Sequence, residues 1–507
     1  MARDIGLVSF DVDRIKEFVF AGHRPLDATG ASEMVRDISE EKEPGKNGRL
    51  IEKLLKDFPC EIIYANGGSG LVKVFDSQKV VELEHRLEYD FRCHTLTGSC
   101  SAVAVIMPET GIKSPNVFQR ALKDLGMKLR FRKLEKAAEE LPEAWTMGYF
   151  QRCQACGVYP SAYRDRIGGE DEYICDSCKK KRSEGRAARH AHKMAESLQD
   201  IAGRDREYVA VIYADVNNAG KMLLKARSPE ELREFSQHLW QAATRTLNEV
   251  ISQQKLGNHY QSPIVGGDDL VMFVPAKGCL QTFQQFWNGL EGYIRNVPKS
   301  LSATELGRAL GQATLSIGLL VASHHLPVPF LFGYVEALTK NAKRLAYERN
   351  GSAVDFLLLK GGSPFSEGIQ SIRKQFLERR LTTTQHFPVN GRLTPVHSFH
   401  LTMKPYLKPD FEKLYRDAAE VARRDLKGQT KHIAAVFESA TPMEALFHTL
   451  YQVVRTRPLQ EFLHSPPLNL QGKEATFFLQ TTKDARGNWV VQTGLWDMVE
   501  LLEMMAL

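Results

Sequence analysis

The sequence predicts an α+β fold made of one repeated domain, a small cysteine-bearing segment and a helical C-terminal domain. Three observations predict it. The order strand, helix, strand, turn, strand, helix, strand occurs twice in the hydrophobic pattern. Two Cys-x-x-Cys pairs separate the two copies, and the remainder of the chain has mainly helical periodicity. We expect the four segments to span residues 1–145, 146–204, 205–362 and 363–507.

The first copy has the element order of a ferredoxin-like palm domain. We expect a further helix to open at Gly30-Ala31-Ser32, where small residues gather. Strands are expected at residues 5–10, 60–65, 71–75 and 101–107, and helices at about 13–20, 77–92 and 115–140.

The central turn of this first domain is Gly67-Gly68-Ser69-Gly70, which carries no carboxylate. One interpretation is an ordinary hairpin turn, because glycine and serine are common in turns. The other is a backbone cradle for a phosphate or a base, with Gly67, Gly68 and Ser69 as nucleotide-binding candidates. In either case we expect a degenerate domain without catalytic carboxylates.

The second copy contains the stretch that carries the chemistry, the tetrapeptide Gly266-Gly267-Asp268-Asp269 between two apolar runs. Such runs predict a hairpin, and its glycines allow positive φ and close approach of a bulky group. Adjacent carboxylates at a hairpin tip repel each other, and a hard divalent cation with oxygen ligands relieves that repulsion. An ordinary turn rich in Asp and Gly is the alternative.

A third carboxylate, Asp215, ends the apolar strand expected at 208–214. This strand and the hairpin are neighbours in a palm domain, so three carboxylates converge and can hold two Mg²⁺ (or Mn²⁺) ions. We assign Asp215 and Asp268 as metal bridges and the carbonyl of Val216 as a further candidate ligand. Asp269 holds the attacking hydroxyl or contacts the second ion. The reaction that this suits is in-line attack of a nucleotide 3′-hydroxyl on an α-phosphate.

Further candidates for contact with the nucleotide lie nearby in the pattern. Gly266 and Gly267 flank the carboxylates, and Asn218 lies in the loop after Asp215. Lys343, on the helix expected at 329–348, can point toward the triphosphate. The alternatives are plain loop residues for the first three and a solvated surface lysine for Lys343.

Between the two palm domains lie Cys153-x-x-Cys156 and Cys175-x-x-Cys178. Two such pairs at this spacing predict a zinc ribbon, in which four thiolates hold a structural Zn²⁺ ion. The basic run Lys179-Lys180-Lys181-Arg182 follows. Most such runs are solvated faces, although contact with a polynucleotide is possible.

Composition limits the class of protein further. The 507 residues have a net charge of +6, which permits a polyanionic partner without requiring one. No apolar run reaches the roughly 18 residues of a membrane span, and the N-terminus lacks the features of a signal peptide. We expect a cytoplasmic protein with no membrane partner. In the C-terminal segment, 475–480 and 489–492 predict a hairpin, and no catalytic pattern stands out.

These motifs, in this order, resemble the large signature subunit of type III CRISPR effector complexes. The likeness covers roughly residues 5–360 and includes Asp11-Val12-Asp13-Arg14-Ile15-Lys16-Glu17-Phe18-Val19-Phe20, Gly30-Ala31-Ser32, the zinc ribbon and Gly266-Gly267-Asp268-Asp269. The second palm domain is also similar to diguanylate cyclases (GGDEF proteins) and polymerases. Their Ala-Lys matches Ala342-Lys343, whereas their signature ends Glu-Phe and this chain has Asp269-Leu270.

The resemblance implies an enzyme of antiviral defence. In that family the paired palm domains bind two ATP molecules, and the second domain joins them 3′ to 5′ into cyclic oligoadenylates. Synthesis is switched on by target RNA that is bound to a complex of effector subunits and guide RNA. Many members begin with a nuclease domain that carries an adjacent His-Asp pair. No such dipeptide occurs in this sequence, so we expect a variant without that domain and without DNase activity.

Two other functions remain open at this stage. The first alternative is a non-catalytic RNA-binding scaffold of an effector complex. The second is a stand-alone dinucleotide cyclase that acts as a homo-oligomer in another defence system. The three aspartates argue against the scaffold, because a purely structural palm domain does not need them. The base, the ring size and the activator do not follow from the sequence.

Overall fold

The computed structural model describes residues 4–39, 50–139, 151–167, 169–203, 206–360, 368–389, 392–439, 442–455, 480–483 and 487–507. The chain divides into two compact units. The first comprises Met1–Pro275, Gln281–Leu315 and Ser323–Gly333, and the second comprises Ala276–Leu280, Ser316–Ala322 and Tyr334–Leu507. The expected domain boundaries near residues 145, 204 and 362 lie outside the described residues, so their positions stay predictions.

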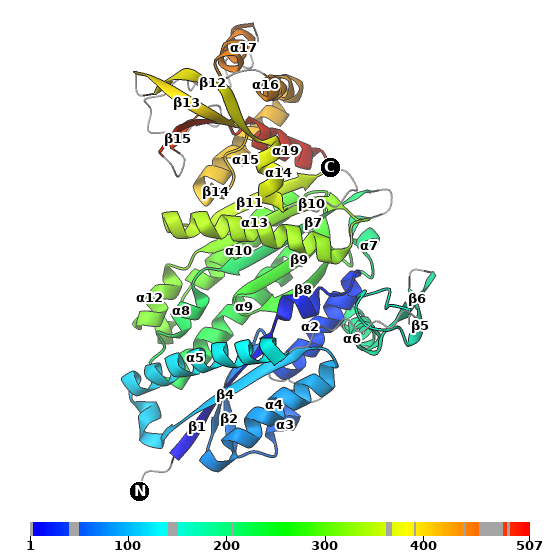
Figure 1. Ribbon diagram of the computed structural model, residues 1–507, viewed down its shortest axis with the longest axis vertical. Coiled ribbons are helices and arrows are strands. Elements are labelled where there is room, and N and C mark those ends of the chain that lie inside the picture. Colours follow the sequence, from blue (N-terminus) through cyan, green and yellow to red (C-terminus); the bar gives the residue numbers. More distant parts are fainter. Residues whose placement is uncertain are drawn as a thin grey trace. The chain divides into compact units, whose positions relative to one another are not determined.

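The first palm domain, in the first unit, has the predicted topology (Figure 1). Its strands are β1 (Asp4–Asp13), β2 (Cys60–Asn66), β3 (Ser69–Val74) and β4 (Ser99–Pro108). They form an antiparallel sheet in the order β2-β3-β1-β4. The central strand β1 is buried from Ile5 to Phe10, which explains why its sequence is almost continuously apolar.

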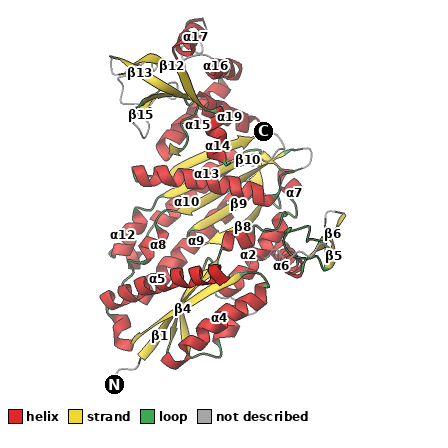
Figure 2. Cartoon of the chain, viewed as in Figure 1, coloured by secondary structure: helices red, strands yellow, loops and turns green. Residues whose placement is uncertain are grey.

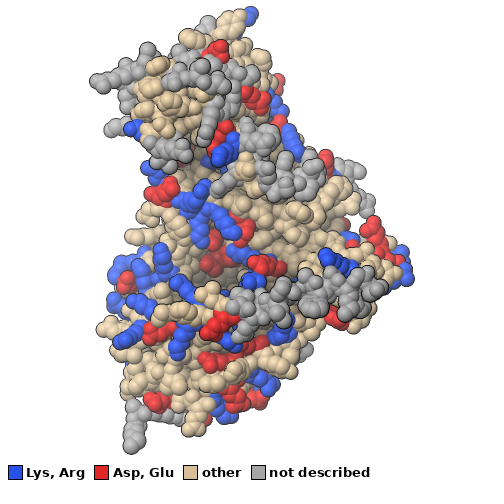
Figure 3. Space-filling view, viewed as in Figure 1, with Lys and Arg blue, Asp and Glu red and all other residues tan. Residues whose placement is uncertain are grey.

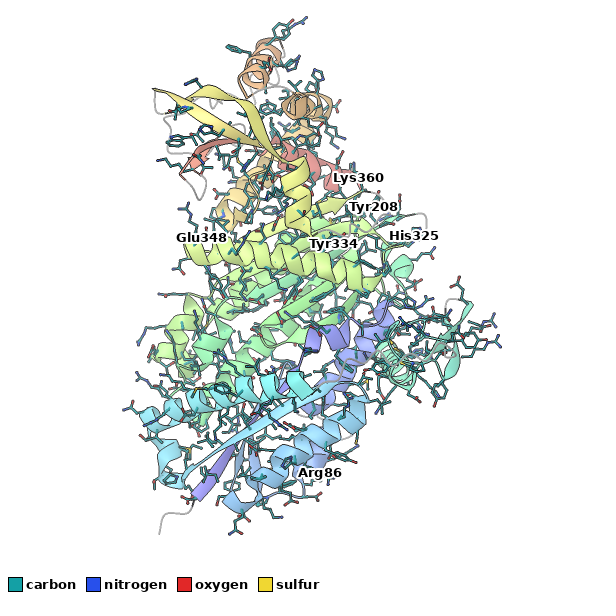
Figure 4. All side chains as sticks on the ribbon, viewed as in Figure 1. Arg86, Tyr208, His325, Tyr334, Glu348 and Lys360 are labelled. Atoms are coloured by element: carbon teal, nitrogen blue, oxygen red, sulfur yellow. The ribbon has the colours of Figure 1, made fainter. Side chains whose placement is uncertain are left out.

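Two longer helices of this domain, α4 (Val80–Thr95) and α5 (Pro115–Glu139), pack against the sheet (Figure 1). Arg86 projects from α4 and pairs with Asp90 (Figure 4). Basic and acidic side chains are interspersed on the face drawn in Figure 3. Arg132 of α5, for example, is bound by Glu88 at 2.8 Å.

Helix α1 (Ile15–Val19) follows β1, and α2 (Pro25–Ser39) begins earlier than predicted. The expectation that a helix opens at Gly30-Ala31-Ser32 is wrong, because Gly30 lies in the middle of α2. The reason for a glycine here is packing. A Cβ on Gly30 would lie 1.6 Å from the carbonyl oxygen of Lys181 on α6 (Asp176–His192). The two helices therefore approach through their backbones.

The cysteine-bearing segment contains the hairpin β5 (Tyr163–Ile167) and β6 (Glu170–Ile174). Helices α6 and α7 (Leu198–Ala202) connect it to the second palm domain. A short hydrophobic cluster formed by Ala155, Ile174 and the cysteines is its core.

Three strands of the second palm domain lie in the first unit: β7 (Tyr208–Val216), β8 (Gln261–Gly266) and β9 (Asp269–Pro275). Strand β9 pairs antiparallel with both β7 and β8, so the predicted hairpin is confirmed. The accompanying helices are α8 (Ala219–Leu223), α9 (Pro229–Gln253), α10 (Cys279–Arg295), α11 (Lys299–Ser302) and α12 (Glu305–Gly311).

Strands β10 (Leu315–Ser323) and β11 (Ala353–Leu359) pair in parallel, and α13 (Val328–Arg349) connects them. Ser316–Ala322 of β10, α13 from Tyr334 onward and all of β11 belong to the second unit. Strand β14 (Tyr406–Leu407) pairs with β11. The C-terminal helices are α14 (Ile369–Phe376), α15 (Lys408–Arg423), α16 (Lys427–Ser439), α17 (Pro442–Arg455) and α19 (Leu495–Ala506).

The C-terminal region also contains a four-stranded sheet in the order β12-β13-β16-β15 (Figure 2). Its strands are β12 (Glu378–Val389), β13 (Arg392–His400), β15 (Gln480–Lys483) and β16 (Trp489–Gln492). The hairpin of β15 and β16 was predicted, although residues 475–479 lie outside the described residues. The hairpin of β12 and β13 was not, because its charged and Thr-rich sequence lacks a clear apolar alternation. In the part of the chain that is described, no helix is long and apolar enough to cross a membrane.

Candidate active site

The hairpin of β8 and β9 brings the three predicted carboxylates to one end of two adjacent strands. Asp215 of β7 is the direct register partner of Asp269 of β9. The amide of Val216 donates a hydrogen bond to the carbonyl oxygen of Asp268 at 2.9 Å, which holds the tip against the end of β7. Gly267 at the turn has a φ of 58°, a conformation that glycine adopts at little cost.

The three carboxylates differ in their surroundings. Asp268 is exposed, whereas Asp215 and Asp269 are half-buried. The carboxylate oxygens of the three aspartates do not form a compact cluster of ligand atoms. Among the described residues, the group whose possible metal-ligand atoms all lie within 4.8 Å of one another is that of the four cysteines. The donor set nevertheless fits a hard cation such as Mg²⁺ or Mn²⁺, which prefers carboxylate oxygens. The assignment of Asp215 and Asp268 as its ligands stays a prediction.

Each carboxylate oxygen of Asp269 has a partner, one of them a neutral hydroxyl and the other an ammonium group. The hydroxyl of Tyr213 donates a hydrogen bond to its Oδ1 at 2.7 Å. The Nζ of Lys16, from helix α1 of the first palm domain, lies 3.3 Å from its Oδ2. Lys16 Nζ also donates to the Tyr213 hydroxyl. The sequence prediction missed both residues. Tyr213 contacts Asp269 from the neighbouring strand β7, whereas the Lys16 contact joins two domains, which no periodicity reveals.

The glycine turn of the first palm domain lies directly against that of the second. A Cβ on Gly67 would lie 3.3 Å from the Cα and the N of Gly267. A cavity of about 50 Å³ lies between the two turns and helices α1 and α2. Its lining includes five of the predicted residues: Gly67, Gly68, Gly266, Asp268 and Asp269. Ser69 is occupied locally, since its hydroxyl donates to the carbonyl oxygen of Asn66 at 3.2 Å.

Asn66 is a second residue that sequence reasoning missed. The residue is 9% exposed, and its Oδ1 is buried without a hydrogen-bond partner among the described residues. It lies beside Gly266, where an added Cβ would be 3.1 Å from that oxygen. Its Nδ2 donates to the carbonyl oxygen of Ser236 on α9 at 3.4 Å. An unsatisfied buried acceptor is costly, so a polar group is expected to bind here.

The remaining predicted residues are not among those that line this cavity. Asn218 has a φ of 62° and begins α8 without a capping hydrogen bond from its side chain. Val216 is buried. Lys343 lies on α13 in the second unit, with Nζ 6.0 Å from the ring centroid of Tyr347. The nucleotide-binding roles of Asn218 and Lys343 and the ligand role of Val216 stay predictions.

The four predicted zinc ligands are brought together. The sulfur atoms of Cys153, Cys156, Cys175 and Cys178 all lie within 4.8 Å of one another, and the Cys156–Cys175 separation is 4.0 Å. After the first pair, Gly157 has a φ of 71° and its amide donates to the carbonyl oxygen of Cys153, so the chain turns tightly under the sulfur atoms. Four thiolates in such a cluster fit a tetrahedral Zn²⁺ ion.

The basic run that follows is not simply a solvated face. Lys181 is 2% exposed and Arg182 is fully buried. The Nζ of Lys181 donates to the carbonyl oxygen of Phe18 at 2.7 Å. Arg182 binds Asp27 at 2.9 Å, Asp165 at 3.0 Å and Glu172. These two cations anchor the ribbon to the first palm domain and are not available to a polynucleotide.

The part of the chain that carries the three aspartates is similar to a known protein family. Residues 208–353 match the protein-family model for Cas10/Cmr2, second palm domain. No curated protein matches the sequence.

Solved structures extend the likeness to the whole chain. A chain of a Csm1–Csm4 cassette in complex with pppApA has a TM-score of 0.58 at 13% identity, over 100% of this chain and 69% of that chain. The cassette in complex with cA3 gives 0.58 at 13% identity, and the one with cA4 gives 0.57 at 12%; each covers 99% of this chain and 69% of that chain. At these identities the likeness shows a shared fold.

Proposed function

We propose that this chain, which is Cas10-like in its second palm domain and in its fold, is a nucleotidyltransferase that joins ATP into cyclic oligoadenylates. It acts as the large subunit of a type III CRISPR-like effector complex in antiviral defence. The observation that carries the proposal is the register of β7 and β9, which sets Asp215 opposite Asp269 with Asp268 adjacent. These carboxylates lie in the domain that matches the second palm of Cas10 and Cmr2.

The fold relatives support adenylates as the substrate class. The Csm1–Csm4 cassettes of the same fold are in complex with ATP, pppApA, cA3 and cA4. The cavity beside Asp268 and Asp269 is walled by two glycine turns, whose bare backbones leave room for phosphate groups. By the same comparison we propose a Csm4-like subunit, guide RNA and target RNA as partners.

The chemistry is the attack of a 3′-hydroxyl on the α-phosphate of a second ATP. A new O3′–P bond forms, the bond from the α-phosphorus to the bridging oxygen breaks, and pyrophosphate leaves. Asp215 and Asp268 would hold a divalent ion, which would lower the pKa of the hydroxyl and neutralise the charge of the pyrophosphate. The chain itself contributes positioning. Tyr213 and Lys16 fix the rotamer of Asp269, and the hydrogen bond from Val216 to Asp268 fixes the tip of the hairpin.

The cysteine cluster has a different role in this proposal. A closed four-thiolate site leaves no open position for a substrate, so Zn²⁺ here is structural. We expect about one zinc per chain by elemental analysis and its loss in Cys175→Ser, with a lower melting temperature because binding of the metal stabilises the fold. A zinc-free wild type with an unchanged melting temperature would contradict this role.

The proposed activity is tested by mass spectrometry of the products formed from each NTP with Mg²⁺ or Mn²⁺. Cyclic adenylates are expected from the wild type and not from an Asp268→Ala/Asp269→Ala double variant. Lys225→Gln is the matched control, because Lys225 is a half-buried lysine of the same unit that pairs with Glu305 at 3.5 Å and lies outside the carboxylate cluster and the cavity.

The outcomes separate the remaining functions. Product from the chain alone indicates a stand-alone cyclase, and product only after addition of guide complex and target RNA indicates a complex-bound enzyme. If neither condition gives a product that depends on Asp268 and Asp269, the chain is a non-catalytic scaffold. Circular dichroism of each variant confirms that the loss is not one of folding.

A further inference from the structure

Helix α6 begins at the cysteine cluster and packs against α2 (Figure 1). Cys175 is its N-cap residue, and Cys178 lies in its first turn. Helices α1 and α2 wall the cavity beside Asp268 and Asp269, which they line with Ile15, Val19, Ser32, Val35, Arg36 and Ser39. No described residue of α6 is part of that lining. An effect of α6 on the cavity therefore has to pass through α1 and α2.

Lys181, three residues beyond Cys178, contacts both of these helices. Its carbonyl oxygen packs on α2, where a Cβ added to Gly30 would lie 1.6 Å from it. Its Nζ donates a hydrogen bond to the carbonyl oxygen of Phe18 in α1 at 2.7 Å. The same ammonium group lies 3.9 Å from the centroid of the Phe18 ring. One residue of α6 thus holds both helices that wall the cavity.

Helix α1 needs such contacts because it is very short. Its five residues form little more than one turn, and a single turn is not stable by itself. Arg14, which precedes it with a φ of 45°, makes no capping hydrogen bond through its side chain. At one end of α1, Lys16 reaches Asp269 and Tyr213, and at the other end Lys181 binds a carbonyl group. The position of α1 beside Asp269 therefore depends on Lys181.

The burial of Lys181 makes this contact costly to break. The residue is 2% exposed, and an ammonium group that loses its acceptor inside the protein loses free energy. Lys180, its neighbour on α6, makes a similar contact with a different helix. Its Nζ donates to the carbonyl oxygen of His94, near the end of α4, and no described residue of α4 lines the cavity. Lys180 is therefore a matched control for Lys181.

We propose that Lys181 is a positioning residue of the nucleotide site, through which the cysteine-bearing segment fixes α1 and, with it, the side chain of Lys16 beside Asp269. The segment then has a second role besides the stabilisation of the fold. Because coupling between two sites is reciprocal, a nucleotide that binds in the cavity also stabilises α6. This inference rests on the proposed function and deepens it.

Amide hydrogen exchange of the zinc-loaded protein, followed by mass spectrometry of its peptides, tests the inference without an activity assay. Lys181→Met keeps the aliphatic stem and removes the donor. In this variant the peptide over residues 15–20 should exchange about tenfold faster than in the wild type. That peptide contains the amides of Phe18 and Phe20, which donate to the carbonyl oxygens of Arg14 and Lys16.

The control variant should show the opposite pattern. In Lys180→Met the exchange of residues 15–20 should stay as in the wild type. The amide of Leu96, which donates to the carbonyl oxygen of Arg92 at the end of α4, should exchange faster. Both variants should keep about one zinc per chain by elemental analysis, because neither lysine is a ligand.

Nucleotide binding gives the second measurement. The affinity for AMPPNP with Mg²⁺, measured by calorimetry, should fall about tenfold in Lys181→Met and stay unchanged in Lys180→Met. In the wild type, AMPPNP should also slow the exchange of the Lys179 amide, which donates to the carbonyl oxygen of Cys175 in the first turn of α6. This last measurement needs no variant.

The outcomes that overturn the inference are specific. Unchanged exchange of residues 15–20 in a folded Lys181→Met, or an equal loss of affinity in both lysine variants, would do so. If Lys181→Met does not fold, bound AMPPNP that leaves the exchange of Lys179 unchanged overturns it instead. Wild-type protein that does not bind AMPPNP contradicts the proposed function, and the exchange patterns of the two lysine variants then still decide whether Lys181 holds α1.

Discussion

The two palm domains share one backbone arrangement and differ in the few side chains that decide the chemistry. In the first, Asp11 of β1 pairs in register with Ser69 of β3, and in the second, Asp215 pairs with Asp269. The amide of Val12 donates to the carbonyl oxygen of Gly68 at 2.8 Å, just as that of Val216 donates to Asp268 at 2.9 Å. Gly68 and Ser69 therefore stand where the second domain has Asp268 and Asp269.

The comparison shows that the first domain has a carboxylate at the position equivalent to Asp215. Asp11 occupies the position of Asp215, although the turn itself carries none, as predicted. Its Oδ2 is bound by Lys133 at 2.6 Å. Burial raises the pKa of the Asp11 carboxyl, and the neighbouring ammonium group opposes that rise. Lys133 also lies 3.6 Å from Asp13, so one ammonium group faces both of these carboxylates of the first domain. This pairing supports a non-catalytic role for the first domain beside the catalytic role proposed for the second.

The largest expected effect comes from exchanging these two aspartates for asparagine one at a time. Asp215→Asn should lower the rate of product formation by at least about a hundredfold, because a bound metal supplies several kcal/mol of charge stabilisation. Asp11→Asn should leave the rate unchanged, because Asp11 is held by Lys133. Initial rates of pyrophosphate release measure both. Equal losses in the two variants would show that the first domain is catalytic as well.

Attachment of the cysteine-bearing segment is the second difference between the domains, and it depends on a buried ion network. Arg182 and Asp27 are both fully buried and bind at 2.9 Å. Arg182→Met should cost about 3–5 kcal/mol of unfolding free energy, because it leaves carboxylates buried without their partner. Arg233→Met removes the partly exposed pair with Glu61 between the two palm domains, and hydrogen bonds to the carbonyl oxygens of Ile62 and Ile63. The ion pair contributes about 0–1 kcal/mol, so the total cost should stay below that of Arg182→Met. Urea denaturation compares the two, and similar costs would contradict the assignment.

Most of the fold could be predicted from the sequence because each palm element has its own local signal. The strand at 208–214 is an unbroken apolar run, and the tetrapeptide at 266–269 is a turn between two such runs. The hairpin joins β8 to β9, and the element order of a palm domain makes β7 the other neighbour of β9. The convergence of Asp215 with Asp268 and Asp269 was therefore predictable as well.

What could not be predicted is what depends on contacts between domains. Lys16 lies in a short helix with no feature that distinguishes it from a surface lysine, and only the pairing of the two palm domains sets it against Asp269. Lys181 and Arg182 looked solvated because a charge run usually is, yet buried carboxylates from α2 and the ribbon surround Arg182. The early start of α2 was missed because Gly30 looks like a helix boundary until its close approach to α6 is known.

The two glycine turns give a smaller and sharper comparison. Gly67 and Gly267 have φ values of 61° and 58°, so alanine at either position costs about 1–2 kcal/mol from backbone strain. A Cβ on Gly67 would also lie 3.3 Å from the backbone of Gly267, whereas one on Gly267 would meet nothing closer than 3.8 Å. Gly67→Ala should therefore be the more destabilising change, by roughly 1 kcal/mol. Equal midpoints in urea would show that the two turns separate easily.

The smallest expected effect concerns pH and His23, which lies where the first palm domain, the ribbon and the second palm domain meet. Its Nε2 is 3.3 Å from Glu172, and its carbonyl oxygen accepts a hydrogen bond from the amide of Val328. The hydrogen bond to Glu172 raises the pKa of His23 above 6.5. Its contribution to stability is therefore full below about pH 6.5 and is lost as the pH rises through the folded-state pKa. The melting temperature of the wild type should exceed that of His23→Gln at pH 6, and the difference should shrink toward pH 9. A difference that stays constant over this range would mean that His23 holds the junction as a neutral ring, through its contact with the carbonyl oxygen of Ala155.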